Sequence, residues 1–271
     1  MRRRRFLQSI PASAAALAAA PAQPRDLWKH PFRRMVIMGE STVEGGGWLE
    51  KQEDRYADVL ARLINSCQET PVEYINKGIG ANAISPRSPG YAKSRKPSAL
   101  ERYKADVIDP KPDLFVLCYG LNDMRANMPI RHFREDLSTI IRDVQKACSP
   151  LIVLTTVYYL TGWRSYPPYD KGSVALTLKY NDSIRQLAET FGCVVADVWD
   201  AEGRTDWLIH YDGVHANKVG NLVIAHRIFE AIVHRSSGLT AATFARDKGT
   251  GWTKNTMKRR EESHDPFRQT W

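Results

Sequence analysis

Five short apolar runs alternate along this chain with longer segments whose apolar residues recur every three or four positions. The runs lie at residues 35–38, 72–75, 114–119, 151–157 and 193–198, and the longer segments lie at 54–67, 98–108, 130–148, 174–191 and from 217 onward. Unbroken runs of this length are typical of strands buried on both faces, and the periodic segments are typical of amphipathic helices. This alternation predicts an α/β fold with a parallel sheet between two layers of helices.

The size of the chain is compatible with one large domain. It has 271 residues, of which 43% are hydrophobic, and none of its apolar runs is long enough for a membrane-spanning helix. We therefore expect an export signal at residues 1–22, one domain at 23–236, and a basic, polar tail at 237–271. The composition of the tail predicts that it is poorly ordered or loosely docked.

Positive charge is concentrated at the two ends of the chain. The net charge is +9, of which residues 2–5 carry four and residues 241–271 a net of three, so the body carries only two. Because nucleic-acid affinity rests mainly on clustered cations that neutralise phosphates, a nearly neutral body argues against a nucleic-acid partner.

The first 22 residues have the order of features found in export signals. Residues 3–8, Arg-Arg-Arg-Phe-Leu-Gln, resemble the twin-arginine signature, a weakly apolar stretch follows at 10–20, and small residues at 20–22 offer a cleavage site. The alternative is a disordered basic leader or an arm that binds nucleic acid. We predict export by a twin-arginine signal, with no membrane segment left after its removal.

Metal-ligand spacing is absent from the four cysteines. Cys67, Cys118, Cys148 and Cys193 contain no pair with the CxxC spacing, so the sequence predicts no structural metal. Cys118 and Cys193 fall in apolar runs, where buried free thiols are common. Whether any of the four forms a disulfide is left open.

Polar clusters follow four of the five predicted strands. Ser41 follows the first, residues 76–82 the second, residues 120–123 the third, and Asp212 and His215 come after the fifth. Because the carboxyl ends of parallel strands meet at one edge of the sheet, these clusters are expected to lie together. Taken singly, each has a structural alternative: Ser41 or Thr42 as a helix cap, Asp212 as a cap, and Asn122 in a turn with Asp123.

Two other loops are expected at the same edge. Residues 76–82 contain two glycines, whose backbone can turn tightly and offer free N–H groups, but their spacing matches neither the Walker A motif nor the dinucleotide fingerprint. Residues 158–172 are rich in aromatic residues and proline. Their rings either stack on a sugar or acyl chain or form a packed loop.

In order along the chain, the polar clusters resemble the four sequence blocks of the SGNH, or GDSL-like, hydrolase superfamily. The blocks are Gly39-Glu40-Ser41, residues 76–82, Gly120-Leu121-Asn122-Asp123 and Asp212-Gly213-Val214-His215. The resemblance implies a flavodoxin-like three-layer α/β/α sandwich with a five-stranded parallel sheet. It also implies an ester hydrolase that needs neither a metal nor a cofactor.

The resemblance assigns a role to each matching residue. Ser41 would be the nucleophile that forms an acyl-enzyme, His215 the base, and Asp212 the partner of the ring's other nitrogen. The oxyanion would be held by the N–H of Ser41, an N–H of Gly80 or Ala81, and the side-chain amide of Asn122. Four other histidines lack this spacing and are predicted to be structural or on the surface: His132, His210, His226 and His234.

At two positions the chain departs from the family pattern. Glu40 stands where the family usually has Asp before the serine, so local hydrogen bonds must adapt to an extra methylene. Ala81 stands at the position of the second-block glycine, while Gly80 comes one residue early, so either could supply the N–H.

The sequence therefore predicts an exported serine esterase or acylhydrolase that acts on a small-molecule or glycan ester. The aromatic segment favours an acetylated carbohydrate as substrate, and lipid-like esters stay open. Two alternatives are an O-acyltransferase on the same scaffold and a non-catalytic carbohydrate-binding protein.

Overall fold

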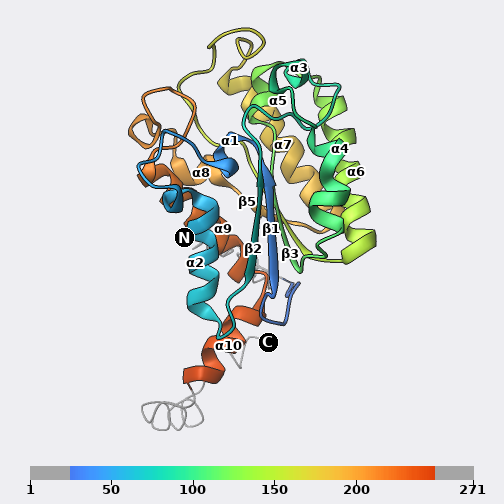
Figure 1. Cartoon of the computed structure of the whole chain (residues 1–271), viewed down its shortest axis with the longest axis vertical. Helices are drawn as coiled ribbons and strands as arrows, with labels where there is room; N and C mark the ends of the chain where they lie inside the picture. Colours follow the sequence, from blue (N-terminus) through green and yellow to red (C-terminus); the bar gives the residue numbers. More distant parts are fainter. Residues whose placement is uncertain (1–24, 248–271) are drawn as a thin grey trace, which may run out of the picture.

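The computed structural model describes residues 25–247 as one α/β domain (Figure 1). The predicted export signal at residues 1–22 and residues 248–271 of the predicted tail lie outside the described residues. Within the described part of the chain, no helix is long and apolar enough to cross a membrane. All four cysteines are free, and Cys118 and Cys193 are buried as predicted.

Five parallel strands form the central sheet, as the sequence predicts. They are β1 (Arg34–Gly39), β2 (Glu73–Gly78), β3 (Leu114–Cys118), β4 (Leu151–Thr155) and β5 (Val194–Ala196), in the spatial order β2-β1-β3-β4-β5. The inner strands β3 and β4 are buried throughout, because helices cover both faces. The order reverses between β1 and β3, where ligands of doubly wound sheets bind.

Helices cover both faces of the sheet (Figure 1). The helices are α1 (Ser41–Glu44), η1 (Gln52–Asp54), α2 (Tyr56–Cys67), α3 (Tyr91–Ser94), α4 (Ala99–Tyr103), the π-helix η2 (Lys104–Ile108), α5 (Leu121–Arg125), α6 (Ile130–Cys148), α7 (Val174–Phe191), α8 (Val198–Glu202), η3 (Asp206–Leu208), α9 (Lys218–Val233) and α10 (Ser237–Asp247). Helices α2, α8 and α9 lie on one face and α4, α6 and α7 on the other. The three-layer α/β/α architecture is therefore confirmed.

Helix α6 shows why the periodic segments were predictable. Its bounds are those expected from the sequence, and its five inward apolar residues are all buried: Phe133, Leu137, Ile140, Ile141 and Val144. Apolar residues spaced three and four apart form one stripe on a helix, and burial of that stripe against the sheet stabilises the helix far more than its intrinsic propensity does.

Several predicted element ends differ from the structure, among them the end of β2 and the start of α2. Strand β2 continues past Asn76 to Gly78, because as an edge strand it keeps pairing with β1, with Gly78 opposite Gly39. Helix α2 begins at Tyr56 with Arg55 in the cap position, two residues later than the periodic segment at 54–67 predicts. The Asp54 carboxylate lies 3.2 Å from Nζ of Lys218.

The expectation of a poorly ordered or loosely docked tail from residue 237 is also wrong for its first part. Residues Ser237–Asp247 form α10, which packs against α2 and α9. Leu239 is buried, and Oγ1 of Thr243 donates to the carbonyl of Cys67. Gly238 lies so close to the backbone of His30 that a Cβ would overlap it, so this contact requires glycine.

Candidate active site

The polar clusters that follow the strands line one cleft of about 630 Å³. Its wall includes all six residues predicted for the site, which are Ser41, Gly80, Ala81, Asn122, Asp212 and His215. Ser41 follows β1 and Asn122 follows β3, the two neighbouring strands at which the strand order reverses. The sheet therefore brings together residues that lie far apart in the sequence, because all its strands point to the same edge.

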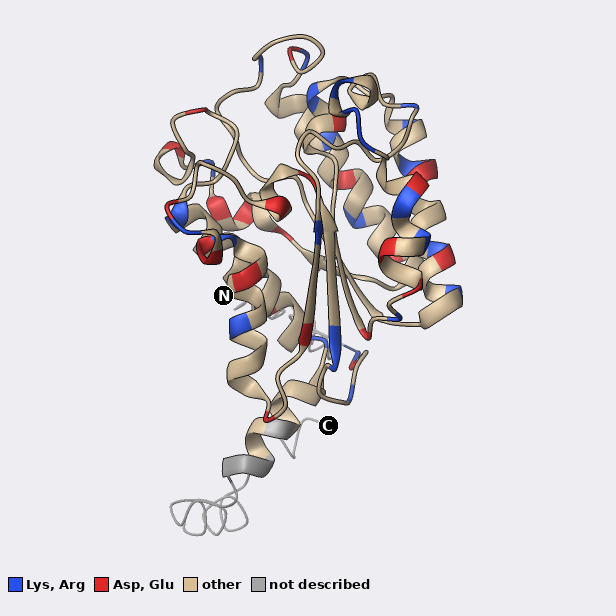
Figure 2. Cartoon of the chain, in the orientation of Figure 1, with Lys and Arg blue, Asp and Glu red and all other residues tan. Residues whose placement is uncertain are grey.

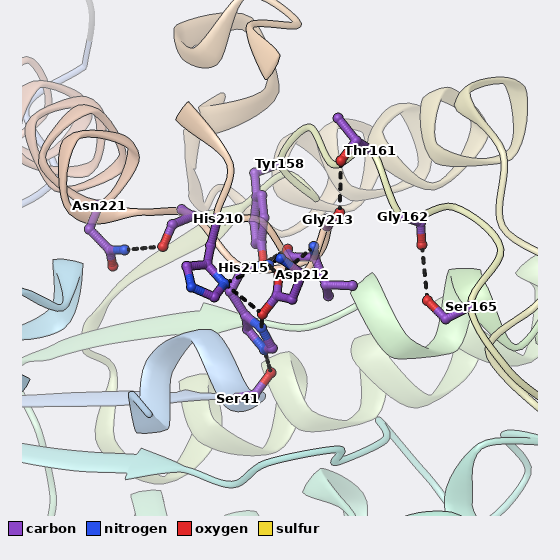
Figure 3. A network of polar contacts seen from close by, with 12 residues as sticks. Ser41, Tyr158, Thr161, Gly162, Ser165, His210, Asp212, Gly213, His215 and Asn221 are labelled. Atoms are coloured by element: carbon purple, nitrogen blue, oxygen red, sulfur yellow. Dashed lines mark hydrogen bonds and ion pairs between the residues drawn. The ribbon is translucent and has the colours of Figure 1, made fainter. Parts of the chain in front are cut away.

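A serine, a histidine and an aspartate are hydrogen-bonded in series in this cleft (Figure 3). Oγ of Ser41 lies 2.9 Å from Nε2 of His215, and Nδ1 of the same ring lies 2.7 Å from Oδ2 of Asp212. A carboxylate can only accept, so the neutral ring carries its proton on Nδ1 and presents Nε2 as the acceptor for the Ser41 hydroxyl. This is the arrangement in which an imidazole can take a proton from a serine.

Ser41 stands where the chain leaves β1 and immediately begins a short helix. It is the first residue of α1, so its backbone N–H has no acceptor within that helix. Glu40 occupies the cap position, so neither Ser41 nor Thr42 caps the helix. Gly39 makes the turn possible, because a Cβ there would lie 2.7 Å from the carbonyl oxygen of Cys118.

The turn that carries His215 is held by its own aspartate. Oδ1 of Asp212 accepts the N–H of Val214 at 2.8 Å and of His215 at 3.0 Å, and Gly213 adopts a φ of 76°. Helix α9 begins only at Lys218, with the side chain of Asn217 as its cap, so Asp212 is not a helix cap.

The loop at residues 158–162 forms hydrogen bonds to the turn that carries His215. The carbonyl of Gly213 accepts the N–H of Thr161 at 2.9 Å and of Gly162 at 2.6 Å. It also lies 3.5 Å from Oγ1 of Thr161 (Figure 3). The hydroxyl of Tyr158 donates to the carbonyl of Val214. The aromatic segment at residues 158–172 therefore does lie at the edge predicted for it.

The surroundings of His215 and Asp212 lower the pKa of both side chains. Burial lowers the pKa of His215 below its usual 6.5, and the hydrogen bond that the ring donates to Asp212 only partly offsets this effect. Burial alone would raise the pKa of Asp212, but hydrogen bonds from the backbone and ring of His215 and from Val214 lower it to about 2. At neutral pH the imidazole is therefore uncharged while the carboxylate is charged.

Four residues that line the cleft offer N–H donors. Besides the N–H of Ser41 itself, the backbone N–H groups of Gly80 and Ala81 make no hydrogen bond within residues 25–247. The amide of Asn122 donates one N–H to the carbonyl of Asn82 at 3.0 Å, which leaves its second N–H for a ligand. Ala81 has a φ of 55°, the left-handed conformation in which glycine is usual.

Glu40 uses its extra methylene to reach across to α5. Its carboxyl is buried and accepts the backbone N–H of Gly120 at 3.3 Å and of Asn122 at 3.0 Å. Burial, reinforced by the nearby Asp123, raises the pKa of Glu40. Glu40 thereby ties the residue before Ser41 to the helix that presents Asn122.

Sequence reasoning missed three residues of this site. The indole of Trp48 stacks on the ring of His215, with centroids 3.6 Å apart and planes inclined by 7°. Arg125 lines the cleft one helical turn after Asn122. His210 was expected to be structural or on the surface, yet its Nδ1 lies 3.1 Å from Oδ2 of Asp212. Arg125 could have been predicted from the sequence, because it lies three residues after Asn122 on one helix. No sequence signal indicated that Trp48 would stack on His215.

The other three histidines predicted to be structural or on the surface do not line the cleft. His226 and His234 are exposed within and at the end of α9, as expected, and His132 lies in α6. No group of three or more His, Cys, Asp or Glu side chains suited to a metal ion occurs among residues 25–247.

Comparison with known proteins identifies the class that this fold and cleft define. Residues 37–223 match the GDSL-like lipase/acylhydrolase family, and the chain belongs to that family. It is accordingly a carboxylic ester hydrolase.

Two curated proteins are similar in sequence. The acetylxylan esterase of Geobacillus stearothermophilus is 21% identical over 210 residues, which cover 72% of this chain and 88% of that protein. The uncharacterized lipoprotein YqeF of Bacillus subtilis (strain 168) is 20% identical over 186 residues, which cover 62% and 71%.

Solved structures show the same fold at low sequence identity. The lipase/acylhydrolase from Enterococcus faecalis has a TM-score of 0.59 at 22% identity, with 74% of this chain and 95% of that chain covered. The acetylxylan esterase Axe2 from Geobacillus stearothermophilus has a TM-score of 0.57 at 17% identity, with 76% and 96% covered.

Proposed function

We propose that the protein is a serine esterase that removes small acyl groups, and acetyl above all, from a carbohydrate. The observation that carries this proposal is the unbroken series of contacts from Ser41 through His215 to Asp212 inside a cleft. Ser41 attacks the ester carbonyl, and His215 takes its proton and then gives it to the leaving alcohol. Asp212 holds the ring and stabilises the imidazolium. Water, activated by His215, then attacks the acyl-enzyme in the same way, which releases the free acid and restores Ser41.

The oxyanion of the tetrahedral intermediate needs donors that are already in place. We assign this role to the N–H of Ser41, the N–H of Ala81 and the free N–H of the Asn122 amide. Ala81 is preferred to Gly80 because its left-handed backbone suits the position at which the family has glycine. Loss of one such donor typically lowers the rate by about 10²–10³.

A carbohydrate substrate is supported by the walls of the cleft and by one relative. Trp48, Tyr166 and Tyr169 line the cleft, and aromatic faces stack well on sugar rings. The relative from Geobacillus stearothermophilus is an acetylxylan esterase. A panel of 4-nitrophenyl esters of increasing chain length, run beside acetylated glycans, tests the preference; faster cleavage of long-chain esters would contradict it.

The role of Ser41 is tested by labelling and by turnover. The unmodified enzyme should react with a fluorophosphonate probe and release 4-nitrophenol from 4-nitrophenyl acetate, and Ser41→Ala should do neither. Ser66→Ala, which removes an exposed serine of α2, is the matched control and should behave as the unmodified enzyme. Equal activity in Ser41→Ala would reject the assignment.

The same experiments separate the two alternatives. A non-catalytic carbohydrate-binding protein would bind glycans without reacting with the probe. An O-acyltransferase would pass the acyl group to an added sugar, so product analysis in the presence of an acceptor would find an acylated sugar in place of free acid.

Export by a twin-arginine signal is also a proposal. It is supported by the order of features in residues 1–22, which lie outside the described residues, and by the similarity to a protein named as a lipoprotein. The double variant with Arg3→Lys and Arg4→Lys should stay in the cytoplasm. Its undiminished export would contradict the twin-arginine assignment.

A further inference from the structure

A buried arginine lines the cleft beside the reacting groups. Arg125 is the last residue of α5 and only 4% exposed. Because it comes three residues after Asn122, both side chains lie on the same face of the helix. Both line the cleft together with Ser41 and His215.

The guanidinium of Arg125 is incompletely partnered. Nη2 donates to Oγ of Ser165 at 2.5 Å, and the guanidinium carbon lies 5.4 Å from the ring centroid of Tyr169. Nε is fully buried and has no hydrogen-bond partner. Nη1 also has no partner within residues 25–247, but unlike Nε it is not fully enclosed, so it is the donor that a ligand in the cleft can reach.

No carboxylate of the described chain forms an ion pair with Arg125. Arg102, which is also buried at 9% exposed, does have such a partner: its Nη1 lies 2.6 Å from Oδ2 of Asp106. The buried carboxyl of Glu40 acts on Arg125 only through its field, since its hydrogen bonds go to the backbone of α5. A buried charge without a counter-ion is unfavourable, so an anion bound in the cleft would relieve an existing strain on the fold.

A loop that contributes Gly80 and Ala81 to the cleft carries an excess of positive charge. The loop at residues 79–98, which carries α3, contains four Lys or Arg residues and no Asp or Glu (Figure 2). Lys93 and Arg95 are exposed and form no ion pair in the described chain, and Nζ of Lys93 lies 5.3 Å from the centroid of the Tyr166 ring. The other two cations of this loop are paired: Lys96 lies 3.7 Å from Glu44, and Arg87 pairs with Glu135 and Asp136. Glu44 also lines the cleft, beside Gly80.

We propose that Arg125 binds an anionic group on the substrate, so that the cleft selects acyl esters of acidic sugars over those of neutral sugars. The proposal rests on the proposed esterase function and names its substrate class. A carboxylate matches the geometry of the planar guanidinium and binds it through charge-assisted hydrogen bonds. The carboxylate belongs on the sugar, because Arg125 lies against Tyr169 and the loop of Ser165 and Tyr166, the aromatic wall on which a sugar ring would stack.

Two substrates that differ only in this group provide the test. One is an O-acetylated methyl galacturonoside, and the other is the O-acetylated methyl galactoside, with a hydroxymethyl group in place of the carboxylate. We expect kcat/KM to be about 10- to 100-fold higher for the acidic substrate, mainly through a lower KM. Arg125→Gln should remove this preference, and Arg125→Lys should keep part of it. The control Arg131→Gln, which removes an exposed charge of α6, should retain it in full.

A ratio near one in the unmodified enzyme, or a ratio that Arg125→Gln leaves unchanged, would overturn the proposal. Cleavage of both substrates without preference, but dependent on Ser41, would leave the esterase function standing.

If Arg125→Gln does not fold, or neither substrate is cleaved, calorimetry with the unmodified protein still decides. D-galacturonate should bind at least tenfold more tightly than D-galactose, and equal or weaker binding would overturn the proposal.

Discussion

Replacing Asp212 with Asn changes one charge and almost no volume, and the surrounding hydrogen bonds dictate how the new amide must sit. Oδ1 accepts two backbone N–H groups, from Val214 and His215. The amide oxygen must keep this place, because an NH₂ group there would face two donors. The NH₂ group therefore takes the place of Oδ2, 2.7 Å from Nδ1 of His215.

This orientation forces the imidazole into the wrong tautomer. Nδ1 must accept from the amide, so the ring proton moves to Nε2, the nitrogen that lies 2.9 Å from Oγ of Ser41. His215 can then no longer take the serine proton, and the charge that would stabilise the imidazolium is gone. We expect kcat to fall by about 10³–10⁴, which is about 4–5.5 kcal/mol of transition-state stabilisation.

The assay is the release of 4-nitrophenol from 4-nitrophenyl acetate, with thermal unfolding measured on the same samples. Asp200→Asn, which alters an exposed carboxylate of α8, is the matched control and should keep kcat within about twofold. A folded Asp212→Asn variant with kcat within tenfold of the unmodified enzyme would refute the tautomer argument.

Three further predictions concern the surroundings of this series. Because burial holds the pKa of His215 below 6.5 and the neutral ring is the base, kcat/KM should reach half its maximum below pH 6.5; a midpoint above pH 7 would contradict this. Trp48→Leu should lower kcat about tenfold, since the indole stacks on the ring that becomes an imidazolium, and Trp48→Phe should keep most of the activity. Burial raises the pKa of Glu202 from 4.5 to about 8, so the folded state holds a proton that the unfolded chain releases near pH 4.5. Stability is therefore lost as the pH rises through this window, and the gain in Tm of Glu202→Gln over the unmodified protein should grow between pH 5 and 8; a constant difference would contradict the assignment.

The elements that could be predicted are those whose own residues carry the signal. Helix α7 has the bounds expected from its pattern, because Ser173 caps its first turn and Gly192 ends it in the left-handed conformation. The ends of β2 and the existence of α10 could not be predicted in this way. The pairing partner decides where an edge strand stops, and α10 is stabilised by its docking on α2 and α9.

Local pattern determined the order of strands and helices, and with it which residues come at the carboxyl ends of the strands. That was enough to single out Ser41, Asn122, Asp212 and His215 as neighbours, because a parallel sheet gathers those ends at one edge. The tertiary structure alone decided what surrounds them. The indole over His215 and the missing counter-ion of Arg125 depend on how side chains from distant segments pack, and no periodicity within a single segment records that packing.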